Sequence, residues 1–422
     1  MSGKVLIVCQ HFVPYTPSVG GVARVAYLAR QMVDQGIEVH VLTSNGFDYG
    51  FLGFEETVSS VQVTYLVDPL KLSVQSGLQR ASVAKDKSYF VLSFLRKLKA
   101  FSRKLIIPDL GIFMVLKYYQ EACRLIEAKG IDAVIVTTPP HSMQLVGGLL
   151  KRRFGARIKL IADYRDSWNA STIFSREGWF TSRISKRLER FSLSYADLVT
   201  YVSGPMIGKM SRIFPGIDLE SKSLLVMNGY AGELCDYVER SKASPIRVGH
   251  FGMADDDPSG YRNIEPLLES VKAANARGAS LQLIFYGLLR LSRVNLENYP
   301  FVELHDAVSH KEAVRIMRDM DYLLILHTDS SNSDEVIPGK FFDYIQARRP
   351  MLCFSPDNME AARMIRGNDL GVWADSESRE ESVAALLGLS DRDFPNLADS
   401  SFAGSFGRRE QYKKLISALG FQ

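Results

Sequence analysis

Short apolar runs alternate with helix-period segments along almost the whole chain, and this alternation limits the folds available to it. An apolar run at residues 5–9 is followed by a helical pattern at 21–35 that ends at Gly36. The same alternation continues with strand-like runs at 38–42, 61–67, 133–136, 159–162 and 198–202, and a helical pattern at 142–153. Apolar strands joined by helices are typical of βαβ units, in which helices cover both faces of a parallel sheet. We therefore expect an α/β fold.

The pattern starts again after a polar stretch at residues 237–245, which predicts a linker. Strand-like runs recur at 247–251, 281–285, 322–326 and 351–354, with helical patterns at 312–320 and 359–366. A chain of 422 residues is also too long for one ordinary core. The sequence therefore predicts two doubly wound, Rossmann-like domains at 1–240 and 241–403, and a C-terminal helix within 404–422 that packs back towards the first domain. Ligands of such sheets bind beyond the carboxyl ends of the strands.

Composition and charge exclude several classes of protein. The net charge is only +4 and the basic residues are dispersed, so a nucleic-acid binder is not indicated. The four cysteines lie far apart without metal-ligand spacing, which is typical of reduced thiols in a cytosolic protein. The chain opens on a strand-like run without a signal peptide, and no apolar run approaches the length of a membrane-spanning helix. We therefore expect a cytoplasmic protein.

Glu335 and Asp343 are separated by seven residues that include Pro338, Gly339 and Lys340. An apolar run precedes this segment and a helical pattern begins within it, so it is expected on a loop that enters a helix. The N-terminus of a helix offers free N–H groups and partial positive charge, which suits a phosphate. Ionised carboxylates accept hydrogen bonds from sugar hydroxyls. The segment therefore predicts a nucleotide-sugar site.

Five motifs together carry a resemblance to a known family. They are Pro-Ser-Val-Gly-Gly at 17–21, Thr-Thr-Pro-Pro-His at 137–141, Ala-Asp-Tyr-Arg-Asp-Ser-Trp at 162–168, Phe-Gly with Tyr-Arg-Asn within 251–263, and the acidic segment at 335–344. In this order they resemble the GT-B retaining glycosyltransferases of glycosyltransferase family 4, especially the bacterial branch that builds O-antigen, capsule and exopolysaccharide. The resemblance covers nearly the whole chain. It implies two Rossmann-like domains that face a central cleft.

The resemblance also implies an activity. We expect transfer of a sugar, with retention of configuration and without a metal or other cofactor, from a nucleotide sugar to a hydroxyl of a glycan or lipid-linked acceptor. A UDP-sugar is the preferred donor. Two rival functions stay open: a nucleotide-sugar epimerase of GT-B fold, and a non-catalytic scaffold of a polysaccharide assembly complex. Met253 keeps the scaffold open, because the family often has an arginine at this position.

Residues of the second domain are implied to bind the donor. Glu335 would face the donor sugar and Asp343 would hold the ribose hydroxyls. Arg262 and Lys340 would clamp the diphosphate and stabilise the leaving group. The other implied donor-site residues are Gly252, His310, Val336, Ile337 and Gly339. Two alternatives stay open here: Arg262 as an ordinary surface arginine, and the acidic residues 255–257 as a cation site.

Residues of the first domain have three implied roles: Gly20 and Gly21 in donor binding, His141 in catalysis, and a loop on the acceptor side. Gly20 and Gly21 would let the backbone approach the diphosphate or the acceptor, or they form a plain βα turn. His141 would lie near the transferred sugar, or it caps the following helix. The loop after the strand at 159–162 supplies the implied acceptor-side residues Asp163, Arg165, Asp166 and Trp168. The tryptophan would stack on a sugar face, whereas the arginine and the second aspartate are equally expected as a structural ion pair.

Residues 96–117 combine basic side chains with Phe, Leu and Ile. Family members often act on lipid-linked acceptors, so this stretch is expected either to dock on the inner face of the cell membrane or to form an ordinary helix with a solvated face. The expected partners are therefore a nucleotide sugar, a glycan or lipid-linked acceptor and a membrane surface, with no nucleic acid.

Overall fold

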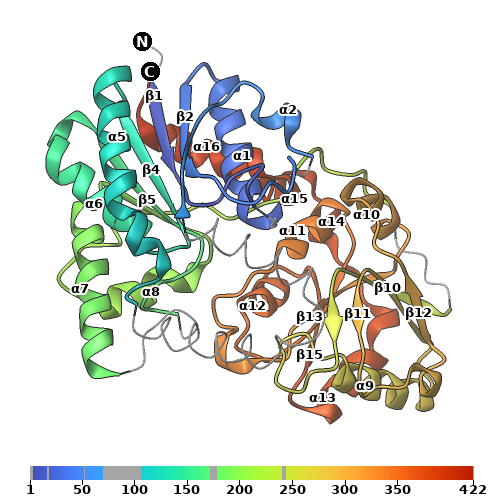
Figure 1. The fold of residues 1–422 in the computed structure, drawn as a ribbon. Helices are drawn as coiled ribbons and strands as arrows, with labels where there is room; N and C mark the ends of the chain where they lie inside the picture. Colours follow the sequence, from blue (N-terminus) through green and yellow to red (C-terminus); the bar gives the residue numbers. More distant parts are fainter. Residues whose placement is uncertain are drawn as a thin grey trace, which may run out of the picture. The chain divides into compact units, whose positions relative to one another are not determined.

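The computed structural model describes residues 3–16, 19–51, 53–69, 106–171, 178–239 and 244–421, and the chain divides into two compact units. Unit 1 comprises Met1–Val226 with Tyr412–Gln422, and unit 2 comprises Met227–Gln411 (Figure 1). The boundaries expected from the sequence, at 240/241 and 403/404, differ from this division by the short stretches 227–240 and 404–411. Residues 240–243 of the expected linker at 237–245 lie outside the described ranges.

Unit 1 is built on a seven-stranded parallel sheet with the strand order β3-β2-β1-β4-β5-β6-β7. Its strands are β1 (Lys4–Val8), β2 (Glu38–Ser44), β3 (Gln62–Leu66), β4 (Ala133–Thr138), β5 (Lys159–Tyr164), β6 (Leu198–Tyr201) and β7 (Ser223–Leu225). Its helices are α1 (Val19–Asp34), α2 (Glu55–Val58), α5 (Val115–Lys129), α6 (Met143–Phe154), α7 (Trp179–Tyr195), α8 (Gly204–Ile213) and, from Tyr412 onward, α16 (Arg408–Leu419). The strand order reverses between β1 and β4, so the loops that follow these two strands lie at the switch point where such folds bind ligands.

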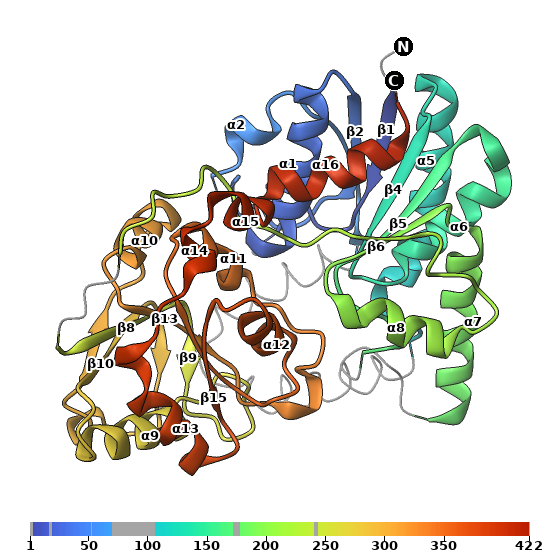
Figure 2. The same cartoon turned by 180° about the vertical axis from the view of Figure 1, so that it is seen from behind.

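Both faces of this sheet are buried, which explains why its strands read as unbroken apolar runs. Val5 and Ile7 of β1 belong to a core with residues of α1 and α16, and these two helices cover that face in Figure 2. Leu6 and Val8 point to the opposite face and belong to a core with residues of α5 and α6. The period of two along one strand thus fills two separate cores.

Unit 2 is built on a six-stranded parallel sheet with the order β12-β10-β8-β13-β14-β15. Its strands are β8 (Ile246–Phe251), β10 (Leu281–Tyr286), β12 (Val302–His305), β13 (Tyr322–Leu326), β14 (Met351–Ser355) and β15 (Gly371–Asp375), beside a small parallel pair of β9 (Ala254–Asp255) and β11 (Leu289–Arg290). Its helices are α9 (Glu265–Ala276), α10 (His310–Met317), α11 (Gly339–Gln346), α12 (Glu360–Gly367), α13 (Arg379–Leu387), α14 (Pro395–Ala398) and α15 (Ser400–Ser405). The strand order reverses between β8 and β13, so the loops after these strands lie at the switch point of this unit.

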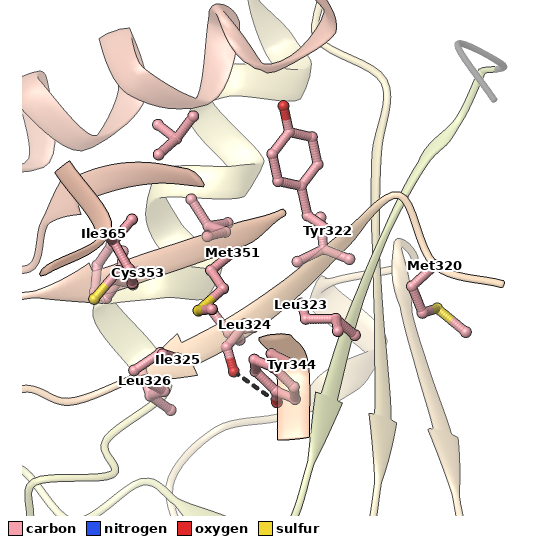
Figure 3. Packing of buried hydrophobic residues seen from close by; sticks show 14 of the residues in the cluster. Met320, Tyr322, Leu323, Leu324, Ile325, Leu326, Tyr344, Met351, Cys353 and Ile365 are labelled. Atoms are coloured by element: carbon pink, nitrogen blue, oxygen red, sulfur yellow. Dashed lines mark hydrogen bonds between the residues drawn. The ribbon is translucent and has the colours of Figure 1, made fainter. Parts of the chain in front are cut away.

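Helix α11 is fixed against the centre of this second sheet. All five residues of β13 are buried, and Figure 3 shows them packed with Tyr344 of α11 and with residues of neighbouring elements. The buried Tyr344 hydroxyl donates a hydrogen bond to the Leu324 carbonyl oxygen at 3.1 Å. A buried bond of this kind orients the helix as well as holding it. The beginning of α11 is therefore positioned by the core of unit 2.

The predicted architecture of two doubly wound, parallel-stranded sheets is confirmed. Strands β12 and β15 were not predicted; each is short and carries a polar or charged residue. Among the described residues, no helix combines the length and the apolar content that a membrane span needs.

A buried ion pair ties together the elements of unit 1. The side chains of Arg24 on α1 and Asp163 on β5 are only 3% and 1% exposed, and their closest N–O distance is 2.7 Å. The carboxylate also accepts hydrogen bonds from Thr137 of β4 at 2.7 Å and Thr200 of β6 at 2.6 Å, while the guanidinium donates to the Val226 carbonyl at 3.0 Å. The arginine holds the pKa of Asp163 below its usual value against the opposing effect of burial. One carboxylate thus joins three strands and a helix.

We expect Asp163→Leu to lower the free energy of unfolding by about 3–5 kcal/mol, because it leaves the Arg24 charge buried without its partner. Denaturant titration followed by circular dichroism measures this loss. The double variant Arg24→Leu/Asp163→Leu is expected to recover most of it, since neither member of the pair is then left as a buried charge without its partner. An Asp163→Leu protein as stable as the parent would show that the pair does not hold unit 1 together.

Candidate active site

The loops at the switch point of unit 2 gather the sequence-predicted cations. Lys340 is the second residue of α11, and its ammonium nitrogen lies 3.1 Å from Nε2 of His250, a buried residue of β8. The His250 Nδ1 lies 3.2 Å from the Leu324 carbonyl oxygen. A carbonyl only accepts, so Nδ1 carries the proton and Nε2 accepts from the ammonium. The buried histidine therefore fixes the position of the Lys340 ammonium through this hydrogen bond.

Burial and neighbouring cations set the charge of this cluster. Burial and the Lys340 ammonium hold the pKa of His250 well below its usual value, so the ring stays neutral. Burial, together with the positive charge of Arg262, lowers the pKa of Lys340 to about 7, while Asp343 opposes this shift. The half-buried Arg262 guanidinium also packs over the Tyr261 ring at 4.7 Å. The site thus holds one permanent cation and one whose charge changes near neutral pH.

Two glycines at the ends of β8 and β10 bring the backbone close to this cluster. Gly252 has φ +131° and Gly287 has φ +134°, conformations that L-residues rarely adopt. A Cβ on Gly287 would lie 2.4 Å from the Gly252 carbonyl oxygen, and a Cβ on Gly252 would lie 3.5 Å from the Lys340 ammonium. Gly252 was predicted from the sequence, whereas Gly287 and His250 were not. The only signal for His250 was its position one residue before the Phe-Gly motif.

The N-terminus of α11 offers part of the expected phosphate cradle. The helix begins at Gly339 after Pro338, so the N–H groups of its first turn have no carbonyl of the same helix to bind. The Val336 N–H differs from the expectation, because it donates to the Ser333 carbonyl at 2.9 Å within a turn. Ile337 and Gly339 therefore fit a phosphate contact better than Val336 does.

The structure brings together two other predicted donor residues. Asp343 of α11 accepts a hydrogen bond from Nε2 of His310, at the start of α10, over 3.1 Å. This hydrogen bond and the charge of Asp343 raise the pKa of His310. Glu335 lies half-buried in the loop before α11. Asp343 is thus held by His310 within the first two turns of α11, and Glu335 lies four residues before the helix begins.

The acidic residues 255–257 stabilise their own loops. Asp256 is buried and accepts hydrogen bonds from the N–H groups of Arg293, Val294 and Ser292. Burial opposes the shift, but these bonds lower its pKa to about 2. Asp257 accepts from Ser259, and Asp255 accepts from the Asp257 N–H. Within the described part of the chain, no three His, Cys, Asp or Glu side chains gather as a metal ion would require. These aspartates therefore have a structural explanation.

In unit 1, two expected acceptor-side residues lie inside the protein. Trp168 is 1% exposed, and its Nε1 donates to the Ser185 hydroxyl at 2.9 Å. Its ring stacks on His141 with centroids 5.6 Å apart, and burial with the nearby Arg165 lowers the His141 pKa to about 3. The tryptophan offers a sugar no exposed face, and Asp163 is occupied by the ion pair with Arg24. This differs from the expected acceptor contact, because both side chains are used to build unit 1.

Arg165 connects the two loops at the switch point of unit 1. Its guanidinium donates to the carbonyl oxygens of Gly21 at 2.6 Å, Thr138 at 2.9 Å and Pro139 at 3.1 Å. It therefore fixes the first turn of α1 against the loop that follows β4. Gly20 and Asp166 are exposed beside this connection, and a Cβ on Gly20 would meet nothing within 4 Å. These two positions are the accessible ones among the predicted residues of unit 1.

Residues 96–105 of the basic region at 96–117 lie outside the described residues, which resume at 106. Lys117 on α5 is exposed, and its ammonium donates to the Val67 carbonyl at 3.0 Å. Docking through this region stays a prediction.

Comparison with known proteins shows which family and which solved structures this chain is similar to. Residues 19–216 match the family described as a glycosyl transferase 4-like domain. No curated protein matches the sequence of the chain. Among solved structures, the chain is similar to the apo form of the lipopolysaccharide outer core galactosyltransferase WaaB, with 14% identity, a TM-score of 0.62 and 99% of both chains covered.

Two further solved structures have the same fold. A glycosyltransferase from Rickettsia africae ESF-5 is 12% identical with a TM-score of 0.60, covering 99% of this chain and 98% of that one. A variant of S. aureus TarM, in complex with Fondaparinux, alpha-GlcNAc-glycerol and UDP, is 10% identical with a TM-score of 0.54, covering 99% of this chain and 100% of that one. The likeness establishes the GT-B fold, and the family match places a glycosyl transferase 4-like domain in unit 1.

The contact between His310 and Asp343 gives a direct test of the site geometry. We expect Asp343→Asn to lower the pKa of His310 towards 6.5, because the hydrogen bond to a charged carboxylate is lost. In the parent protein the pair is complete below about pH 6.5 and is lost as the pH rises through the raised pKa. NMR titration of the imidazole measures the shift. Asp306→Asn, which removes an exposed carboxylate four residues before His310, is the matched control and leaves the pKa unchanged. Equal titration of His310 in parent and Asp343→Asn would contradict the geometry.

Proposed function

We propose that this protein is a retaining glycosyltransferase that moves a sugar from a nucleotide sugar, with a UDP-sugar as the preferred donor, to a hydroxyl of a glycan or lipid-linked acceptor. The observation that carries the proposal is the meeting of Lys340 and Arg262 with the N-terminus of α11 at the switch point of unit 2. Two printed descriptions support the details. One solved relative is an outer core galactosyltransferase, and another was solved with UDP and a GlcNAc-glycerol compound.

The donor diphosphate is proposed to bind between the two cations and the first turn of α11. Phosphate oxygens accept hydrogen bonds from N–H groups and are stabilised by fixed positive charge. Asp343 holds the ribose hydroxyls, and Glu335 faces the transferred sugar. His250 acts through Lys340 as a positioning residue, because it fixes where the ammonium points.

The transfer needs little covalent help from the protein. The bond between the anomeric carbon and the diphosphate oxygen breaks, and the acceptor oxygen forms a bond to the same face of that carbon. The acceptor proton passes to the departing diphosphate oxygen, so the charge balances without a protein base. Negative charge grows on the diphosphate as the bond breaks, and Arg262 with Lys340 stabilises it. These two cations provide the stabilisation that a divalent metal provides elsewhere, so we propose a metal-independent reaction.

Acceptor contacts are proposed at the exposed positions of unit 1, which are Asp166 and the Gly20 turn. Arg165 keeps these positions together through its three carbonyl contacts. We place the reaction in the cytoplasm of a bacterium, in the assembly of surface polysaccharide. The four cysteines are free thiols in the structure, which fits a reducing compartment.

The proposed function is tested by replacing the carboxylate that faces the sugar. We expect Glu335→Ala to lower kcat by about 10²–10³-fold, as for the loss of one group that orients or stabilises a transition state. The assay measures release of the nucleoside diphosphate from nucleotide-sugar donors, with and without acceptor. Glu380→Ala, which removes an exposed carboxylate on α13, is the matched control and keeps full activity.

Different outcomes of this assay separate the rival functions. Release that depends on an acceptor supports transfer. An epimerase would convert the sugar without releasing the nucleotide. A scaffold would not bind nucleotides, so UDP, GDP and ADP would leave its melting temperature unchanged. The Glu335→Ala substitution would also leave its function unchanged.

The charge of Lys340 predicts a pH dependence of donor binding. A bound diphosphate raises the pKa of Lys340 above its free value of about 7, so binding takes up a proton at higher pH. Affinity for UDP is therefore expected to be full below about pH 7 and to fall by about tenfold per pH unit above it, until the pKa of the complex is reached. Isothermal titration calorimetry between about pH 6 and pH 9 measures this slope.

Variants of the cluster show whether Lys340 causes this slope. Lys340→Met is expected to weaken UDP binding at low pH and to remove the slope. His250→Leu takes away the acceptor of the ammonium and moves the midpoint to lower pH, whereas His250→Gln keeps an acceptor and restores part of the shift. An unchanged slope in Lys340→Met would assign the pH dependence to another group.

A further inference from the structure

Helix α7 of unit 1 presents a basic groove that the proposed reaction does not use. The groove has a volume of about 460 Å³ and is lined by residues of α7 and of the end of α8. Figure 1 labels both helices in unit 1. Its lining contains four cations, which are Arg183, Lys186, Arg187 and Arg190, and none of its described lining residues is a carboxylate. Ile213 and Phe214 add an apolar wall. A concave surface with this charge is complementary to an anionic partner.

The spacing of these residues puts them on one face of the helix. Positions 179, 183, 186, 187 and 190 follow the i, i+4, i+7, i+8, i+11 pattern of a single helical stripe. All four cationic residues are exposed, and among the described residues none of them forms an ion pair. Arg183 lies over the Trp179 ring at 5.6 Å, and Arg190 lies over the Phe214 ring at 5.6 Å. Within the part of the chain that the structure describes, no carboxylate pairs with the positive charge of the stripe.

The single carboxylate of α7 is turned inward. Glu189 is buried, and its Oε2 accepts hydrogen bonds from the backbone and side-chain nitrogens of Asn169 at 3.1 and 2.7 Å. Ser185, on the same buried side, accepts from Trp168. The helix thus separates its charges: the acid helps to fix it to unit 1, and the bases face solvent.

Two large aromatic side chains stand exposed at the beginning of this helix. Trp179 is 76% exposed and Phe180 is 66% exposed, the two highest values among the large exposed apolar side chains described. A free phosphate would gain no favourable contact from these apolar rings. Aromatic rings beside Lys and Arg are typical of surfaces that enter the headgroup region of a bilayer. The combination favours a lipid surface over a soluble anion.

We propose that the outer face of α7, formed by Trp179, Phe180, Arg183, Lys186, Arg187 and Arg190, docks on the surface of an anionic phospholipid bilayer. The cations bind lipid phosphates, and the two rings enter between the headgroups. Each cation near such a surface strengthens binding by roughly fivefold. This docking does not depend on sugar transfer, and its site differs from the basic region at 96–117.

The position of the tryptophans makes the proposal directly measurable. The chain has three tryptophans. Trp168 is buried, and Trp373 is half-buried with its Nε1 bonded to the Ser355 carbonyl, so Trp179 alone is mostly exposed. We expect vesicles of phosphatidylcholine with phosphatidylglycerol to shift the emission to shorter wavelength, and brominated acyl chains to quench it. Neither change is expected with pure phosphatidylcholine or in the Trp179→Phe variant.

Charge variants identify the cations responsible. We expect the Ser variant of Arg183, Lys186, Arg187 and Arg190 to lose vesicle binding by more than about 100-fold in co-sedimentation at about 0.1 M salt. The matched control replaces the exposed Arg277, Arg290, Arg293 and Lys311 of unit 2 by Ser, which gives the same net charge, and keeps the affinity. Trp179→Ser/Phe180→Ser is expected to weaken binding without changing its dependence on salt.

Three outcomes would overturn the proposal. Absence of binding to anionic vesicles would exclude a lipid surface as the partner. Binding without a change at Trp179 would assign the contact to another surface, such as the region at 96–117. A response of Trp179 to inorganic phosphate but not to vesicles would assign the groove to a soluble anion. Folding of each variant is checked by its melting temperature, so that loss of binding is not confused with loss of structure.

Discussion

The order of the parallel strands decides where chemistry can occur in each unit. Parallel strands end at one edge of a sheet, and helices leave that edge in opposite directions where the strand order reverses. In unit 2 this point lies between β8 and β13, so the Gly252 loop and the start of α11 meet there although they are far apart in the chain. The same reversal between β1 and β4 brings Gly21 and the Pro139 loop together in unit 1. Gly252 and Lys340 in unit 2 owe their positions to this constraint, whereas His310 follows the edge strand β12 and Asp163 lies on β5.

Lys340 illustrates how burial can bring the pKa of a lysine close to neutral pH, so that its charge responds to pH and to a bound ligand. A lysine on a solvated helix keeps its charge throughout the physiological range. Here desolvation and the nearby Arg262 lower its pKa to about 7, and the neutral His250 ring supplies the acceptor that keeps the ammonium in place. An anion that binds would supply the charge that the site lacks. The two neighbouring positive charges therefore favour the binding of an anion such as a diphosphate.

The acceptor-side motif of unit 1, at residues 162–168, is used mainly for structure and not for ligand binding as its composition suggests. A polar and aromatic loop at the end of a strand looks like a binding surface, yet Asp163 and Trp168 point inward and Arg165 binds three carbonyl groups. Buried polar groups need hydrogen-bond partners inside the protein. Asp163, Arg165 and Trp168 therefore use their polar atoms for contacts within unit 1 and not for a ligand. Helix α7, by contrast, turns its one acid, Glu189, inward and exposes the bases Arg183, Lys186, Arg187 and Arg190.

The sequence by itself determined the alternation of strands and helices, the two parallel sheets and the loops that carry the glycine and acidic motifs, because apolar period and glycine position are local properties. It also predicted that His310, Asp343, Arg262 and Lys340 belong to one region. Only the tertiary structure decided which side chains are accessible. It buried Asp163 and Trp168, added His250 and Gly287, engaged the Val336 amide in a turn and revealed α7 as a basic surface, since burial and pairing depend on neighbours that are distant in the chain.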